Sequence, residues 1–251
     1  MKPFILMLTF LTRIPLRVSF PFNDEDFRKG IWFIPVIGLL IGLALYGVYA
    51  LMDGIVPPLF LSFIVVILYL LITGGLHIDG LADTLDATAS NRSRERMLEI
   101  MKDSHIGTFG VLGIVAWFSG MVVMLSLAPW ACLVFPVAGR SMALFSAATN
   151  SYARESGMGK VIIDGTNGWH VVFSVLISGL SVILLFPFGG DPTMIIAVTI
   201  SYFIVFLLSW IHIKCISRKL SGITGDVIGY VIEFSGFLLV LVTVLISLVL
   251  E

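Results

Sequence analysis

The stretch that decides the fold is Pro57–Thr88, which reads PPLFLSFIVVILYLLITGGLHIDGLADTLDAT. It opens with a long apolar run, and about 20 such residues cross about 30 Å of hydrocarbon as an α-helix. Asp79, Asp83 and Asp86 follow within a few residues. Like charges placed directly after an apolar helix predict a membrane span that ends at a polar site.

The composition extends this interpretation to the whole chain. Hydrophobic residues make up 58% of the 251 residues and charged residues only 12%, whereas soluble domains carry about 25% charged residues. Segments long and apolar enough to span lie at 32–52, 57–76, 109–127, 131–149, 170–188, 193–213 and 227–250. We therefore predict an all-α, polytopic integral membrane protein with about seven transmembrane helices, embedded in the lipid bilayer and without a nucleic-acid partner.

The basic residues predict the orientation. The connections at 53–56, 128–130 and 189–192 are short turns, whereas those at 1–31, 77–108, 150–169 and 214–226 are long and polar. The long ones hold every Lys and Arg except Arg140, namely Lys2, Arg13, Arg17, Arg28, Lys29, Arg92, Arg94, Arg96, Lys102, Arg154, Lys160, Lys214, Arg218 and Lys219. Positive loops stay in the cytoplasm. We expect a cell (inner) membrane protein with its N-terminus and active site cytoplasmic and Glu251 outside.

The sequence shows no internal repeat, and we expect no cleavable signal peptide. We expect one membrane-embedded catalytic domain over 1–251, with 1–31 as a cytoplasmic or interfacial segment. Gly38 and Gly42 form a small-residue pattern typical of close helix packing. Cys132 and Cys215 have no metal or redox spacing, so they are expected to be buried small side chains.

The three aspartates predict a metal site. Spacings of four and three residues place Asp79, Asp83 and Asp86 on one helix face, where they repel one another. A divalent cation removes that repulsion, and carboxylates suit Mg²⁺. Asp103 is a candidate fourth ligand, and one metal or two could bind. The alternative is a solvated acidic helix start, which fits Asp79 and could fit Asp83 but does not fit Asp86.

Other polar residues gather around the same connection. Gly74, Gly75 and Gly80 let the backbone bend and approach a ligand closely. His77 could be a general base, a metal ligand or a cap at the interface. Residues 92–100 read as an amphipathic helix whose basic side, with Lys102 beyond it, attracts phosphate or lipid head groups or is simply solvated.

Three charges further along are unusual because of their depth. Ionisable groups within spans face the bundle interior and are functional by default, and Arg140 and Glu233 are two of these. Asp226 precedes Glu233 by seven residues, so both could pair with Arg140, orient it, or bind metal and substrate; a structural buried ion pair is the alternative. Arg154 and Lys160 lie in a glycine-rich loop suited to phosphate. Carboxylates and cations on one face of the membrane are typical of phosphoryl transfer.

These stretches resemble a known family. TGGLHIDGLADTLDA (73–87), EIMKDSHIGTFG (99–110) and GITGDVIG (222–229) are similar to the signature stretches of cobalamin synthase, the adenosylcobinamide-GDP ribazoletransferase family. FLTRIP (10–15), IPVIGLLIG (34–42), GR (139–140) and ARESGMG (153–159) resemble its other patterns. The chain departs from the family pattern at Ala87, Tyr230, Ile232 and Gly236.

The resemblance implies an activity. A hydroxyl of α-ribazole, or of its 5′-phosphate, attacks the cobinamide-linked phosphate of adenosylcobinamide-GDP, and GMP leaves. It implies Mg²⁺ on Asp79, Asp83 and Asp86, charge neutralisation by Arg140 or Arg154, and a proton acceptor in His77 or an aspartate such as Asp83. The expected substrate-binding residues are Gly75, Gly80, Lys102, Arg154, Lys160, Asp226 and Glu233. An oligomer remains possible.

Two alternatives stay open from the residues alone. A membrane phosphotransferase of the CDP-alcohol type would use similar aspartates, but its Asp-Gly-x-x-Ala-Arg run is missing. A cation or metabolite transporter would place acidic residues near the bilayer midplane in both halves, whereas here they gather at one face.

Overall fold

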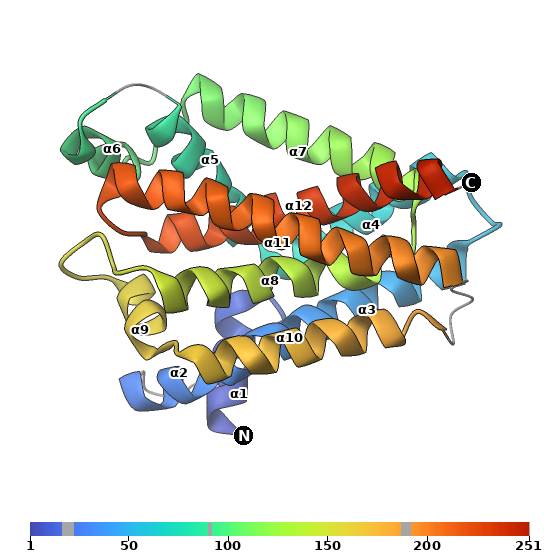
Figure 1. The fold of residues 1–251 in the computed structure, drawn as a ribbon, viewed down its shortest axis with the longest axis horizontal. Helices are drawn as coiled ribbons and strands as arrows, with labels where there is room; N and C mark the ends of the chain where they lie inside the picture. The colour runs from blue at the N-terminus through green and yellow to red at the C-terminus, as the bar shows by residue number, and fades with distance from the viewer. Residues whose placement is uncertain (17–22, 90–91, 187–191, 251) are drawn as a thin grey trace.

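The protein is a bundle of helices, described here from a computed structural model over residues 1–16, 23–89, 92–186 and 192–250 (Figure 1). In the described residues the only β-pairing is an isolated bridge between Tyr152 and Ile223. The elements in order are α1 (Lys2–Leu11), α2 (Asp24–Gly30), a 3-10 turn η1 (Ile31–Phe33), α3 (Ile34–Met52), α4 (Pro58–Thr73), α5 (Leu76–Thr88), α6 (Arg94–Ile100), α7 (Thr108–Leu127), α8 (Ala131–Thr149), α9 (Met158–Gly165), α10 (Gly168–Ile183), α11 (Pro192–Leu220) and α12 (Gly225–Leu250).

The predicted number of spans agrees with this bundle. Five described segments are long and apolar enough to cross a membrane: Asp24–Met52, α7, α8, α11 and α12. Two further spans result if each sharply bent pair counts as one, with α4 and α5 meeting at 92° and α9 and α10 at 90°. The fold is therefore an all-α, polytopic membrane protein, as the sequence predicts.

The bend after α4 corrects the predicted span at 57–76. The helix ends at Thr73 because Gly74 and Gly75 take positive φ values of 64° and 71°, a left-handed conformation that glycine adopts without steric cost. With 16 residues, α4 is about 24 Å long. Since α5 leaves at 92°, it runs along the membrane plane when α4 crosses it.

Two other predicted boundaries were also wrong. The span at 193–213 continues to Leu220, so the loop predicted at 214–226 shrinks to residues 221–224, and its basic residues lie on the last turns of α11. The span predicted from 170 begins at Gly168, because Asn167 caps the helix with its side chain. The predicted end at 188, most of the turn at 189–192, Arg17 and Glu251 lie outside the described residues.

The short helices gather at one end of the bundle. Figure 1 shows α2, α5, α6 and α9 together at the left, whereas the C-terminus lies at the right. We call the end that carries these four helices the polar end. The polar end holds the acidic helix α5 and the glycine-rich loop around Arg154. The predicted carboxylates and the predicted phosphate-binding loop therefore lie at the same end of the protein.

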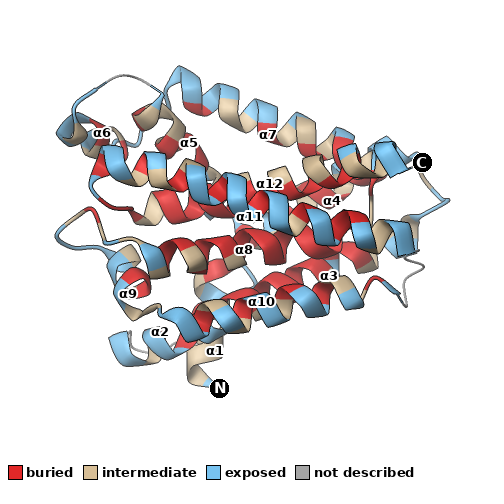
Figure 2. Cartoon of the chain, viewed as in Figure 1, coloured by how far each residue is buried: buried red, intermediate tan, exposed pale blue. Residues whose placement is uncertain are grey.

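Helix α8 forms the centre of the core. It is the most buried of the spanning helices, as its red ribbon shows in Figure 2. A Cβ atom at Gly38 of α3 would lie 2.8 Å from the Pro136 oxygen of α8, and one at Gly42 would collide with the Leu133 backbone. The predicted small-residue packing of this pair is confirmed.

Replacing Gly42 by alanine should therefore destabilise the bundle. The added methyl group meets helix backbone, which cannot move aside as a side chain can, and overpacking typically costs about 1–3 kcal/mol. Thermal unfolding in detergent would measure the change. The matched control is Gly47→Ala in the same helix, where an added Cβ has open space; equal melting temperatures for both variants would contradict this packing.

Candidate active site

A cavity of about 420 Å³ opens at the polar end. Its walls come from α1, α3, α5, α8, α9 and α12, together with the segments that precede α7 and α9. The predicted site residues that line it are His77, Asp79, Gly80, Lys102, Arg154 and Asp226. Segments far apart in the sequence thus meet around one space, as the phosphoryl-transfer hypothesis requires.

Helices α5 and α12 approach each other through glycine. A Cβ atom at Gly80 would lie 2.5 Å from the Asp226 carbonyl oxygen and 3.2 Å from the Gly229 Cα atom. A Cβ atom at Gly229 would lie 3.3 Å from the His77 Cα atom. This contact brings the acidic face of α5 next to Asp226, a neighbour that the sequence spacing did not indicate.

The resulting crowding of carboxylates is greatest at Asp83. The pKa of this carboxyl is raised from 3.8 to about 7, mainly by burial and then by the negative charges of Asp79, Asp226 and Asp86, in that order. The positive charge of Arg154 opposes the shift in pKa. A group in this position favours a nearby cation, either a proton or a metal ion.

Two predicted metal ligands are occupied elsewhere. The Asp86 carboxylate accepts hydrogen bonds from the backbone N–H groups of Gly107 at 2.7 Å and Gly110 at 2.8 Å, and so caps the start of α7. Asp103 is exposed and contacts the His105 ring at 2.6 Å, and that contact lowers the pKa of Asp103.

The remaining carboxylates offer a partial metal site. No group of three or more His, Cys, Asp or Glu side chains is placed to hold a metal ion within the described residues. Asp79 and Asp226 nevertheless line the cavity, and Asp83 interacts electrostatically with both. Mg²⁺ usually takes only one or two carboxylates and keeps several waters, so these three residues fit its donor chemistry.

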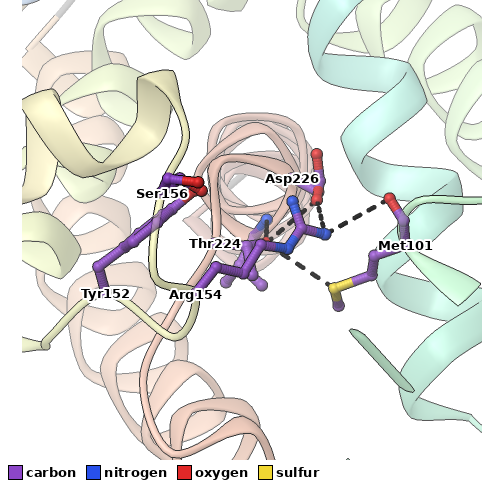
Figure 3. A network of polar contacts seen from close by, with 7 residues as sticks. Met101, Tyr152, Arg154, Ser156, Thr224 and Asp226 are labelled. Carbon is purple, nitrogen blue, oxygen red and sulfur yellow. Dashed lines mark hydrogen bonds and ion pairs between the residues drawn. The ribbon is translucent and has the colours of Figure 1, made fainter. Parts of the chain in front are cut away.

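Arg154 links three segments at the cavity wall (Figure 3). Its Nη2 atom lies 2.9 Å from Asp226 Oδ2 and 3.5 Å from the Met101 carbonyl oxygen. Thr224 also donates to Asp226 Oδ2, at 3.3 Å. The predicted pairing of Asp226 with Arg140 is therefore wrong, since the partner of Asp226 is Arg154.

The loop that carries Arg154 is fixed from two sides. Ala153 donates its N–H to the Ile223 oxygen, and Ile223 donates to the Ser151 oxygen, both at 2.9 Å. Arg94 of α6 donates to the carbonyls of Leu220 and Ala153, both at 2.8 Å. Arg94 thus has a structural role. The sequence had indicated either a phosphate contact or a solvated position for this side chain.

The deep charges lie behind the cavity wall. Arg140 is fully buried and donates from Nη1 to the Pro136 oxygen at 3.0 Å, while its Nε and Nη2 atoms have no hydrogen-bond partner among the described residues. Glu233 accepts a hydrogen bond from the Tyr69 hydroxyl at 2.7 Å and lies 3.7 Å from His77 Nδ1. Nothing in the sequence marked Tyr69, because it reads as one more membrane residue.

Two of the predicted substrate-binding residues make local contacts or turns. Gly75 supplies part of the bend between α4 and α5. Lys160 is exposed and donates from Nζ to the Glu155 carbonyl oxygen at 3.0 Å. Neither Gly75 nor Lys160 is among the described residues that line the cavity.

Known proteins resemble this chain over nearly its full length. The model of a family described as cobalamin-5-phosphate synthase matches residues 3–245. A protein of Alkaliphilus oremlandii named adenosylcobinamide-GDP ribazoletransferase is 44% identical over 245 residues, or 96% of each chain. Proteins with the same name from Acetivibrio thermocellus and Clostridium acetobutylicum are 38% and 36% identical; the first match covers 94% of each chain, the second 92% of this chain and 91% of the relative. No solved structure matches the chain.

The raised pKa of Asp83 predicts a stability effect in the absence of metal. Its pKa in the folded protein, about 7, lies above the ordinary value of 3.8, so protonation favours the folded state and stability falls as pH rises between these values. Asparagine cannot ionise. In the presence of a chelator, Asp83→Asn should melt at a higher temperature than the natural protein at about pH 8, and this difference should shrink as pH falls and become small at about pH 4. A loss of stability at both pH values would contradict the crowding of charge.

Proposed function

The chain belongs to the cobalamin-5-phosphate synthase family, and from this premise we propose how its cavity carries out the transfer named for its relatives. The protein is an adenosylcobinamide-GDP ribazoletransferase, which completes the nucleotide loop of cobalamin. This membership sets aside the two alternatives of a CDP-alcohol enzyme and a transporter. The observation that carries the placement of the reaction is the cavity at the polar end, where Asp79, Lys102 and Arg154 face one space.

The reaction exchanges one phosphate ester for another. A hydroxyl oxygen of α-ribazole, or of its 5′-phosphate, attacks the phosphorus that is linked to cobinamide. The bond from that phosphorus to the bridging oxygen of the diphosphate breaks, and GMP leaves with that oxygen. The hydroxyl proton passes to His77 or to a carboxylate of α5. Atoms and charge balance without an oxidant or a further reactant.

The cavity wall supplies charges of both signs. Lys102 and Arg154 line it with Asp79 and Asp226, so cations are available for the diphosphate while carboxylates lie on α5 and α12. Transfer of a phosphoryl group depends mainly on positioning and on neutralising charge. Arg154 is already held at Asp226, so it is fixed in place before any substrate arrives. Gly80 lets α12 pack closely against α5 at the same wall.

We place Mg²⁺ on the carboxylates that remain accessible. One or two of Asp79, Asp83 and Asp226 would hold it together with water, while Asp86 continues to cap α7. When bound, the metal ion supplies positive charge to the diphosphate and acts as a Lewis acid. The residues of the chain hold the ion, orient the diphosphate and relieve the repulsion on the acidic face of α5.

We place the polar end in the cytoplasm. Among the described residues, basic side chains of the predicted long connections lie at this end, such as Arg94, Lys102 and Arg154, and positive segments are retained in the cytoplasm. Trp32 and Trp169 are exposed near the starts of α3 and α10, where aromatic side chains are typical of the membrane interface. The nucleotide substrate would then reach the cavity from the cytoplasm.

The first test is release of GMP by the purified protein in liposomes. Release should require both adenosylcobinamide-GDP and α-ribazole or its phosphate, and a chelator should abolish it until Mg²⁺ is added in excess. Release that needs only one substrate, or that survives chelation, would contradict the proposed mechanism. Comparing the two acceptors also identifies the one that this chain prefers.

Substitution of Asp79 tests the position of the site. Asp79→Asn should lower kcat by about 100-fold or more, because one charge-stabilising group is typically worth that factor. Asp53→Asn is the matched control, since Asp53 is an exposed aspartate in the turn between α3 and α4. Equal activity of both variants would place the reaction elsewhere.

A further inference from the structure

A buried polar group lies directly behind the cavity wall. It consists of Tyr69 of α4, His77 of α5 and Glu233 of α12, which are respectively 1%, 4% and 1% exposed. The Tyr69 hydroxyl donates to Glu233 Oε1 at 2.7 Å, and His77 Nδ1 lies 3.7 Å from the same oxygen. Only His77 of the three lines the cavity, within the described residues.

His77 is incompletely satisfied in this arrangement. Its Nδ1 atom is buried and has no hydrogen-bond partner in the described part of the chain. Leaving a buried polar atom unpaired costs about 1–3 kcal/mol, so a small movement towards Glu233 is favourable. Hydrogen bonds of catalytic groups are often long in the free protein and tighten when substrate binds.

Glu233 is held where it cannot touch substrate. Its carboxylate is fixed by Tyr69, and its backbone oxygen accepts a hydrogen bond from Trp117 Nε1 at 3.3 Å. Arg140 is close enough for its charge to act on Glu233. An ionisable group buried inside a span is costly and is kept for function rather than for stability. Glu233 can therefore influence the cavity through His77, which lines it.

Tyr69 is itself rigidly packed. Its ring lies 5.0 Å from the Phe135 ring and 6.0 Å from the Trp117 ring, measured between centroids. Tyrosine has few rotatable bonds, so its hydroxyl defines one position for the Glu233 carboxylate. The bend at Gly74 and Gly75 directs α5 away from the axis of α4, and His77 in the first turn of α5 then lies beside that carboxylate.

We propose that Glu233 and Tyr69 are positioning residues that fix the ring of His77 for the transfer reaction. The partner of one imidazole nitrogen determines the tautomer and direction of the other. With Nδ1 turned to Glu233, Nε2 faces the cavity and accepts a hydrogen bond from the attacking hydroxyl. This role rests on the proposed function. Glu233 was predicted to contact substrate, whereas in this proposal it orients His77, which contacts substrate.

A double-mutant cycle on the full protein tests the role. GMP release is measured with both substrates and Mg²⁺ for the natural protein, Glu233→Gln, His77→Ala and the variant with both changes. Glu233→Gln should lower kcat by about 10- to 100-fold, as removing the partner of a working histidine does, and leave KM nearly unchanged. In the His77→Ala background the same change should have almost no further effect, because the residue it orients is gone.

A structural role would give a different result. If Glu233 only stabilised the bundle, Glu233→Gln would lower the melting temperature rather than kcat. The effects of Glu233→Gln and His77→Ala would then be independent of each other. Either finding, or a natural kcat in Glu233→Gln, would overturn the proposal. No GMP release by the natural protein would overturn the proposed function and this role with it, so the two failures are distinguishable.

A second variant keeps the test decisive if Glu233→Gln does not fold. Tyr69→Phe retains the ring and removes only the hydroxyl, and we expect a fall in kcat of about 3- to 10-fold, which is the loss of one hydrogen bond of about 1 kcal/mol. The matched control is Tyr202→Phe, which removes a tyrosine hydroxyl on α11 that contacts Ser181 at 3.3 Å. Equal kcat values for the two variants would overturn the proposal.

Discussion

The contact of α5 with α12 is the constraint on which the site depends. Gly80 and Gly229 let two helix backbones meet, because a side chain at Gly80 would collide with the Asp226 carbonyl and one at Gly229 would press tightly on His77. A helix that carries three aspartates is thereby pressed against a helix whose first turn carries a fourth. Without this approach, Asp226 and Arg154 would face a different space from Asp79, and the cavity would hold cations without the carboxylates that balance them.

The same contact concentrates negative charge beyond what the protein neutralises. Arg154 is paired with Asp226, and the pKa of Asp83 rises to about 7 because burial and its acidic neighbours disfavour ionisation. Such a site is less stable than it could be when empty, and a bound cation relieves the repulsion. Stability lost at a functional site is common where activity requires a strained arrangement. The proposed cation would complete the charge balance that the folded chain leaves open.

The sequence predicted what local periodicity determines and missed what depends on contacts between distant helices. The number of spans and the placement of Asp79, Asp83 and Asp86 on one helix follow from local patterns alone, and the structure agrees with both. That Asp86 caps α7, that Asp226 pairs with Arg154, and that Arg94 binds two loop carbonyls depends on where other helices lie. Tyr69 carried no signal at all, because a tyrosine in an apolar run is ordinary until its hydroxyl meets Glu233.

The origin of the cavity walls has a consequence for the making of the protein. The first wall segment is α1 and the last is α12, so no truncated nascent chain contains the whole site. At about 5–20 residues per second, α12 is completed on the order of 10 s after α5 leaves the ribosome. During that interval the acidic helix is present without Asp226, and the glycine face of α5 has no partner. The wall of the cavity is therefore complete only after α12, the last helix, has joined the bundle.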